Sequence, residues 1–137
     1  MITTENQLEQ LDHYFSYHTS FFIDDARKKL DLAQALQDTD AAMKEQSKLE
    51  AMIAVRQIFD TARKEKTLED VKRKYHEGLE IYRQGLQLEI DNARAAGDKQ
   101  KFVLAQIQLT VAKNPATGLF YAAYQKATGN FAKVTHE

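Results

Sequence analysis

Few of the side chains that most often carry chemistry occur in this chain, and they are widely spaced. It has no cysteine, so disulfides, thiolate nucleophiles, zinc–thiolate centres and iron–sulfur clusters are excluded. Its serines, Ser16, Ser20 and Ser47, are not flanked by the glycine-rich turn that exposes a nucleophile. The five glycines are dispersed, so no glycine-rich loop could hold a phosphate. We therefore predict no catalytic residue and a protein that is not an enzyme.

Histidines and carboxylates leave one further route to a metal or cofactor site. A di-iron site in a helical bundle needs Glu-x-x-His pairs on several helices, and this sequence contains no such pair. His76 and Glu80 lie one helical turn apart, but a single pair of this kind is common by chance. His18 falls on an apolar stripe, where a histidine usually belongs to the core. We predict no metal and no cofactor, and keep a small-molecule or metal binder in the bundle core as an alternative.

Aromatic residues have an uneven distribution along the chain. Five of the thirteen fall within nine residues, at Tyr14, Phe15, Tyr17, Phe21 and Phe22. On a helix, Phe15 and Phe22 share one face, whereas Tyr14, Tyr17 and Phe21 form a second row beside it. Aromatic rows with polar tips are enriched in protein interfaces. The sequence therefore predicts a contact surface here, and the alternative is a wide first helix that packs against two neighbours.

A fourth candidate contact residue lies near the other end of the chain. Tyr121 points away from the apolar side of the helix expected around it. The predicted partner-binding residues are thus Tyr14, Tyr17, Phe21 and Tyr121, and the partner is another protein or a second copy of this chain. Residues 1–45 hold nine acidic and four basic side chains, a net charge of −5. We expect the partner's complementary patch to be basic.

Basic side chains gather in one segment, and they suggest a different function. They are Arg63, Lys64, Lys66, Lys72, Arg73 and Lys74, interrupted by Glu65, Glu69 and Asp70. On a helix, the three consecutive cations 72–74 point in three directions and do not build the basic stripe that a duplex needs. The whole chain has a net charge of −1. We expect a solvated helix junction, and keep nucleic-acid association through residues 63–74 as an alternative.

Helices must position these residues, because the composition leaves little room for other structure. The chain has 137 residues, the size of one domain, and 43% of them are hydrophobic. Five glycines and one proline are too few for an all-β sandwich with many tight turns. No uncharged stretch approaches the roughly 18 residues that span a bilayer, and no signal segment is evident, so we expect a cytoplasmic protein.

The spacing of apolar residues predicts four or five helices. The first begins near Glu5 and runs to about residue 37, either unbroken or bent at residues 22–26. The second runs from the Asp38–Asp40 cap to about residue 66, and no Gly or Pro separates it from the third, so one continuous rod is an alternative. The third shows the clearest stripe: Leu68, Val71, Tyr75, Leu79, Tyr82, Leu86, Ile90 and Ala93. Gly78 and Gly85 beside it indicate close helix packing.

The last quarter of the chain contains one competing pattern. Residues 102–112 carry no charge and are apolar in all directions on a helix, which is typical of a buried helix. Their alternation also fits a strand, but one strand would lack a partner, so we predict helix. We expect Asn114–Pro115 to start a new helix that Gly129 ends, followed by a flexible tail at 130–137.

The sequence therefore predicts an all-α fold, a single domain over residues 1–137. Four to five helices form a mostly antiparallel, up-and-down bundle in which the first three are long. The predicted function is a non-enzymatic protein–protein interaction module, such as an adaptor, a small inhibitor or an assembly component. This prediction depends on the aromatic-rich face of the first helix and on the absence of motifs for catalysis.

Overall fold

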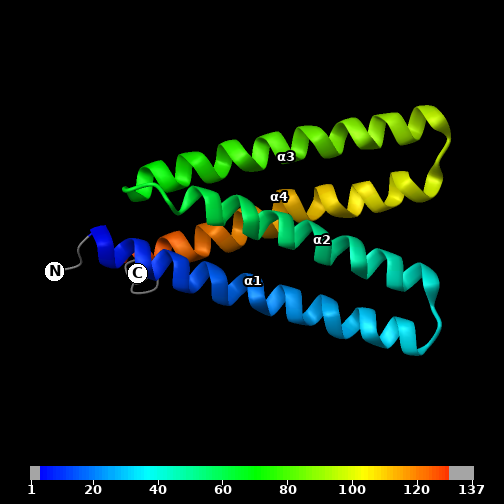
Figure 1. The fold of residues 1–137 in the computed structure, drawn as a ribbon, viewed down its shortest axis with the longest axis horizontal. Helices are drawn as coiled ribbons and strands as arrows, with labels where there is room; N and C mark the ends of the chain where they lie inside the picture. Colours follow the sequence, from blue (N-terminus) through cyan, green and yellow to red (C-terminus); the bar gives the residue numbers. More distant parts are fainter. Residues whose placement is uncertain (1–3, 130–137) are drawn as a thin grey trace, which may run out of the picture.

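The computed structural model describes residues 4–129 and consists of four helices in one bundle (Figure 1). They are α1 (Thr4–Ala35), α2 (Thr39–Ala62), α3 (Leu68–Ala96) and α4 (Lys99–Thr128). Successive helices run in opposite directions, so the predicted all-α, up-and-down bundle is confirmed. The predicted tail at 130–137 lies outside the described residues.

The bundle is flattened rather than square in cross-section. The parallel helices α2 and α4 form its short diagonal and pack along each other, whereas α1 and α3 hardly touch. The four helices lie together at one end of the molecule. At the other end the α1–α2 turn and the α3–α4 turn lie apart, as Figure 1 shows.

Three of the helices begin at a capping side chain, and one of these caps is the predicted Asp38. Asp38, Thr67 and Asp98 each accept a hydrogen bond of 3.1 Å from the backbone N–H three residues further on. The cap at Thr67 separates α3 from α2, which ends at Ala62 and not near residue 66. The continuous rod is therefore wrong. In contrast, α1 continues through residues 22–26.

Helix α4 continues through Pro115, so the predicted new start at this residue is wrong. A proline inside a helix removes one backbone donor and crowds the preceding turn. Side chains of α3 contact the carbonyl groups on either side of it. Arg83 Nε donates to the Ala112 carbonyl (2.8 Å), and the Tyr75 hydroxyl donates to the Ala116 carbonyl (2.8 Å). These bonds supply polar partners at the proline and help the helix to continue.

Residues 102–112 form part of α4, so the helix prediction is confirmed over the strand alternative. The expectation that this segment is buried on all sides is wrong. Ala105, Leu109 and Ala112 are buried, but 39% of Val103 is exposed. This helix is covered by α2 and α3 here, and one side stays open because α1 has diverged.

An aromatic cluster lies at the centre of the main core. Its members, Phe15, Phe59, Tyr75 and Phe120, come from all four helices and are at most 2% exposed. The ring centroids of Phe15 and Phe59 are 4.2 Å apart, and the rings of Tyr75 and Phe120 stack at 4.3 Å. Such contacts add to the apolar area that each ring buries. This cluster holds together the end of the bundle at which the four helices meet.

A second, smaller apolar cluster lies between α3 and α4 alone. It contains Leu86, Ile90, Ala105, Leu109 and Ala112. The predicted α3 stripe thus serves both clusters, and every member is buried except Tyr82, which is partly buried.

The two glycines beside that stripe have different surroundings. A Cβ on Gly78 would lie 2.7 Å from Cγ2 of Ile58 on α2, so this glycine permits the helices to approach. A Cβ on Gly85 would meet no atom within 4 Å. The prediction of close packing is therefore right for Gly78 and wrong for Gly85.

Among residues 4–129, none of the four helices combines the length and the apolar character needed to cross a bilayer.

Candidate functional site

Two aromatic side chains protrude from the outer face of α1. Tyr17 is 61% exposed and Phe21 is 71% exposed, and they lie one helical turn apart. Phe15 on the opposite face is fully buried, and Phe22 packs against the main core. We call Tyr17 and Phe21 the outer aromatic pair.

A shallow hollow of about 480 Å³ borders this pair on the same helix. It is lined by Glu9, Asp12, His13, Ser16, Tyr17 and Ser20. Asp12 is held in place by Arg63 of α2, whose Nη1 lies 2.8 Å from its Oδ2, and by the Ser16 hydroxyl, 3.3 Å from its Oδ1. The hollow therefore presents two carboxylates beside an exposed tyrosine ring.

Tyr14, the third predicted residue of this row, has a different environment. Its ring packs against the main core, and the Lys126 ammonium group of α4 lies 4.9 Å from the ring centroid. This geometry is that of a cation–π contact between two helices. Tyr14 therefore takes part in the packing of α1 on α4, while Tyr17 and Phe21 remain available to a partner.

Tyr121 is 60% exposed but lies on another side of the molecule. Thr117 and Tyr124 share its flank of α4, and both contact α3. Thr117 Oγ1 accepts from Arg83 Nη2 (2.7 Å), and the Lys72 ammonium group lies 5.2 Å from the centroid of the Tyr124 ring. Tyr121 thus follows the α3-facing flank, and the structure does not bring it together with the outer aromatic pair.

The six basic residues of the alternative nucleic-acid site do not form one surface. Arg63 pairs with Asp12 and Asp60, and Arg73 pairs with Asp70 and Glu77 of its own helix. Lys72 lies over the Tyr124 ring, whereas Lys64, Lys66 and Lys74 are exposed. Half of the set is already engaged within the protein, which favours the solvated junction.

Two of the histidines within residues 4–129, His18 and His76, are partly buried, whereas His13 is exposed. His76 lies edge-on to Phe120, with centroids 5.6 Å apart, and His18 is half-buried on α1. Burial lowers the pKa of both imidazoles, helped by Lys126 near His18 and by Lys72 and Arg83 near His76. Within residues 4–129, no three His, Asp or Glu side chains are grouped so that they could hold a metal ion.

These histidines predict a decrease in stability on acidification. A lowered pKa in the folded state means that the unfolded chain binds more protons, so stability falls as the pH drops below about 6.5. Urea unfolding between about pH 7.5 and about pH 5 measures this slope. His76→Gln and His18→Gln should each make the slope shallower. Equal slopes in the wild type and both variants would show that these histidines do not cause the loss of stability at low pH.

Sequence reasoning did not identify Arg83, the most highly connected polar side chain between α3 and α4. Besides Ala112 and Thr117, its guanidinium reaches the Lys113 carbonyl, 3.4 Å from Nη2. It borders a hollow of about 780 Å³ between the two helices, lined mainly by polar residues such as Glu80 and Gln84. No local signal marks this arginine, because its partners lie about thirty residues further along the chain.

With this geometry in view, the chain was compared with known proteins. No family model, no curated protein and no solved structure matches it.

Proposed function

We propose that this protein is a non-enzymatic protein–protein interaction module that binds its partner through Tyr17 and Phe21. The observation that carries the proposal is the exposure of two large aromatic rings, one turn apart, on a helix whose opposite face contributes the buried Leu11 and Phe15 to the main core. Aromatic anchors of this kind supply a large contact area at low entropic cost. Roles as an adaptor, a small inhibitor or an assembly component in the cytoplasm belong to the same proposal.

The surroundings of the pair support a partner of defined chemistry. The rings suit an apolar pocket, and the adjacent hollow with the Glu9 carboxylate suits a basic side chain at its border. We therefore propose another protein chain that presents an apolar patch next to a Lys or Arg. Association with a second copy is the other outcome to be measured.

Truncation of the pair is expected to weaken binding strongly. Tyr17→Ala or Phe21→Ala should cost about 2 kcal/mol of binding free energy, roughly thirtyfold in Kd, if these rings fill a desolvated pocket. The partner that co-purifies with the wild-type protein would be isolated, and its Kd for the wild type and for each variant would be measured by titration calorimetry. Self-association of the wild type and the variants would be measured by sedimentation. Both variants should unfold at nearly the wild-type temperature because the rings are exposed.

Two matched variants make this test specific. Ile81→Ala removes an apolar side chain that is 70% exposed on α3, and Tyr121→Ala removes an exposed aromatic ring elsewhere. Neither should change Kd by more than about twofold if α1 carries the contact. Normal affinity of both α1 variants would refute the assignment, and loss of affinity only in Tyr121→Ala would move the contact to α4.

A further inference from the structure

The α3–α4 hairpin changes its packing partners halfway along its length. Towards the chain ends, Val111 and Ala116 of α4 belong to the main core with all four helices. Beyond this level, the second cluster is built from α3 and α4 residues alone. We call residues 86–110, which include the α3–α4 turn, the outer arm.

Both helices have a weak point at the level where the outer arm begins. In α4, Pro115 has no N–H to donate to the carbonyl of Val111. In α3, Gly85 occupies an exposed helical position where no neighbour requires a glycine. A glycine at such a position costs about 1 kcal/mol relative to alanine and loosens the helix.

One side chain joins these two weak points. Arg83, two residues before Gly85, contacts the segment that includes Pro115 at three acceptors: the carbonyls of Ala112 and Lys113, and Thr117 Oγ1. Charge-assisted bonds at 2.7 and 2.8 Å are strong ones.

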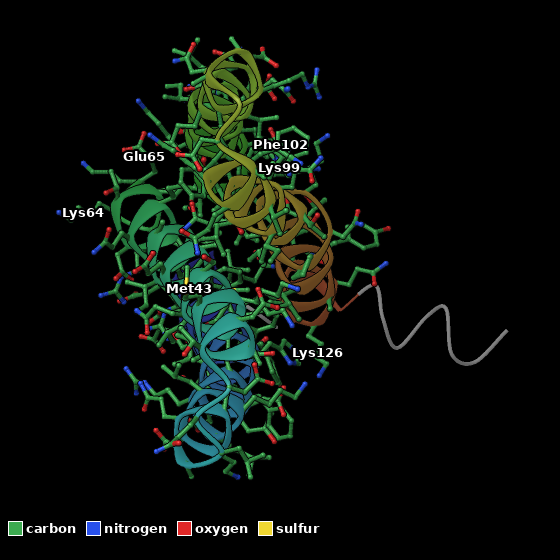
Figure 2. All side chains as sticks on the ribbon, turned by 90° about the vertical axis from the view of Figure 1, so that its right-hand side faces the viewer. Met43, Lys64, Glu65, Lys99, Phe102 and Lys126 are labelled. Carbon is green, nitrogen blue, oxygen red and sulfur yellow. The ribbon has the colours of Figure 1, made fainter. Side chains whose placement is uncertain are left out.

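The side-chain hydrogen bonds between the outer arm and the other hairpin are weak. Gln108 Nε2 lies 3.3 Å from Glu50 Oε2, and Gln100 Nε2 lies 3.4 Å from Met43 Sδ. Both contacts are exposed and long, and a sulfur is a weak acceptor. Figure 2, which looks onto the ends of the hairpins, shows the α3–α4 turn and the α1–α2 turn at opposite sides of that view.

We propose that Gly85 and Pro115 form a hinge for the outer arm and that Arg83, which joins α3 to α4 beside both residues, is the latch that keeps this hinge from bending. Arg83 holds the helix together where the proline interrupts its hydrogen bonds. Release of Arg83 lets residues 86–110 swing away as a unit while the aromatic core stays intact. This device lies on a different part of the molecule from the outer aromatic pair and does not depend on the proposed function.

Because the chain has no cysteine, spin labels report the position of the arm without background. One label at Asp31→Cys on α1 and one at Lys99→Cys at the start of α4 span the two hairpin ends; both positions are exposed. Pulsed electron resonance should show one narrow distance distribution in the otherwise wild-type chain. Arg83→Ala should broaden it towards longer distances. Arg73→Ala, whose partners lie in its own helix, should leave it unchanged.

A second substitution tests whether Arg83 acts through the hinge. Adding Pro115→Ala restores the missing backbone donor, and adding Gly85→Ala stiffens α3. Either should narrow the distribution of Arg83→Ala again. Broadening that persists in both double variants would refute the hinge, and a narrow distribution in Arg83→Ala alone would refute the latch.

Hydrogen exchange keeps the proposal testable if Arg83→Ala does not fold. With Arg83 in place, Gly85→Ala should slow exchange of the amides in residues 86–110 roughly two- to fivefold, the range expected from its helix propensity. The exchange rates of amides in the main core should change less, because opening of the arm does not expose these amides. A uniform change over the whole chain, or none, would overturn the hinge.

Discussion

Replacing Phe59 with alanine is expected to lower the free energy of unfolding by about 3–5 kcal/mol. Phe59 is fully buried, and its ring contacts those of Phe15, Tyr75 and Phe120, so the truncation leaves a cavity that four helices line. Single domains are stable by only about 5–15 kcal/mol, so the loss should be visible as a large shift of the urea midpoint.

Phe21→Ala is the matched control for this prediction. It removes the same side chain from a position that is 71% exposed, and the expected change is within about 0.5 kcal/mol. If the two substitutions destabilised the protein equally, the aromatic cluster would not be the centre of its core. Phe21 would then be a packing residue and not a contact residue.

Leu86→Ala is expected to destabilise the protein by about 2–5 kcal/mol. Leu86 is buried between α3 and α4 in the second cluster, next to the proposed hinge. Leu88, two residues further on, is 61% exposed, so Leu88→Ala should change stability by less than about 0.5 kcal/mol. Thermal or urea unfolding of the two variants compares the same substitution on opposite faces of one helix.

The shape of the Leu86→Ala transition is informative as well. A loss below roughly 1 kcal/mol would show that this face of α3 is already open in the free protein. A shallower urea dependence with early loss of signal from residues 86–110 would show that the outer arm unfolds separately from the main core. The expected result is a single transition shifted to lower urea.

Much of the fold could be predicted from the sequence because it depends on neighbours within one or two helical turns. Asp38, Thr67 and Asp98 cap helices through N–H groups only three residues away. The stripe on α3 requires only that apolar side chains recur every three or four residues. Within the candidate site, the same periodicity separates Phe15 from Tyr17 and Phe21, and the structure places these three residues as expected.

Other features depended on helices that are distant in the sequence. Continuation of α4 through Pro115 involves Arg83 and Tyr75, which lie thirty to forty residues earlier. Gly78 and Gly85 are alike in sequence context, but only Gly78 has Ile58 of α2 against it. The burial of a helix face is decided by which helix covers it, and no local pattern specifies that neighbour.

The candidate site shows the same division. Sequence alone determined that aromatic rings would occupy two faces of the first helix, because helical geometry and residue spacing are local properties. Only the tertiary structure decided that Tyr14 packs under Lys126, that Tyr121 follows α3, and that Tyr17 and Phe21 stay exposed. The physical reason is that apolar burial and cation–π contacts form between groups brought together by the packing of whole helices, whereas capping and periodicity act within a few residues.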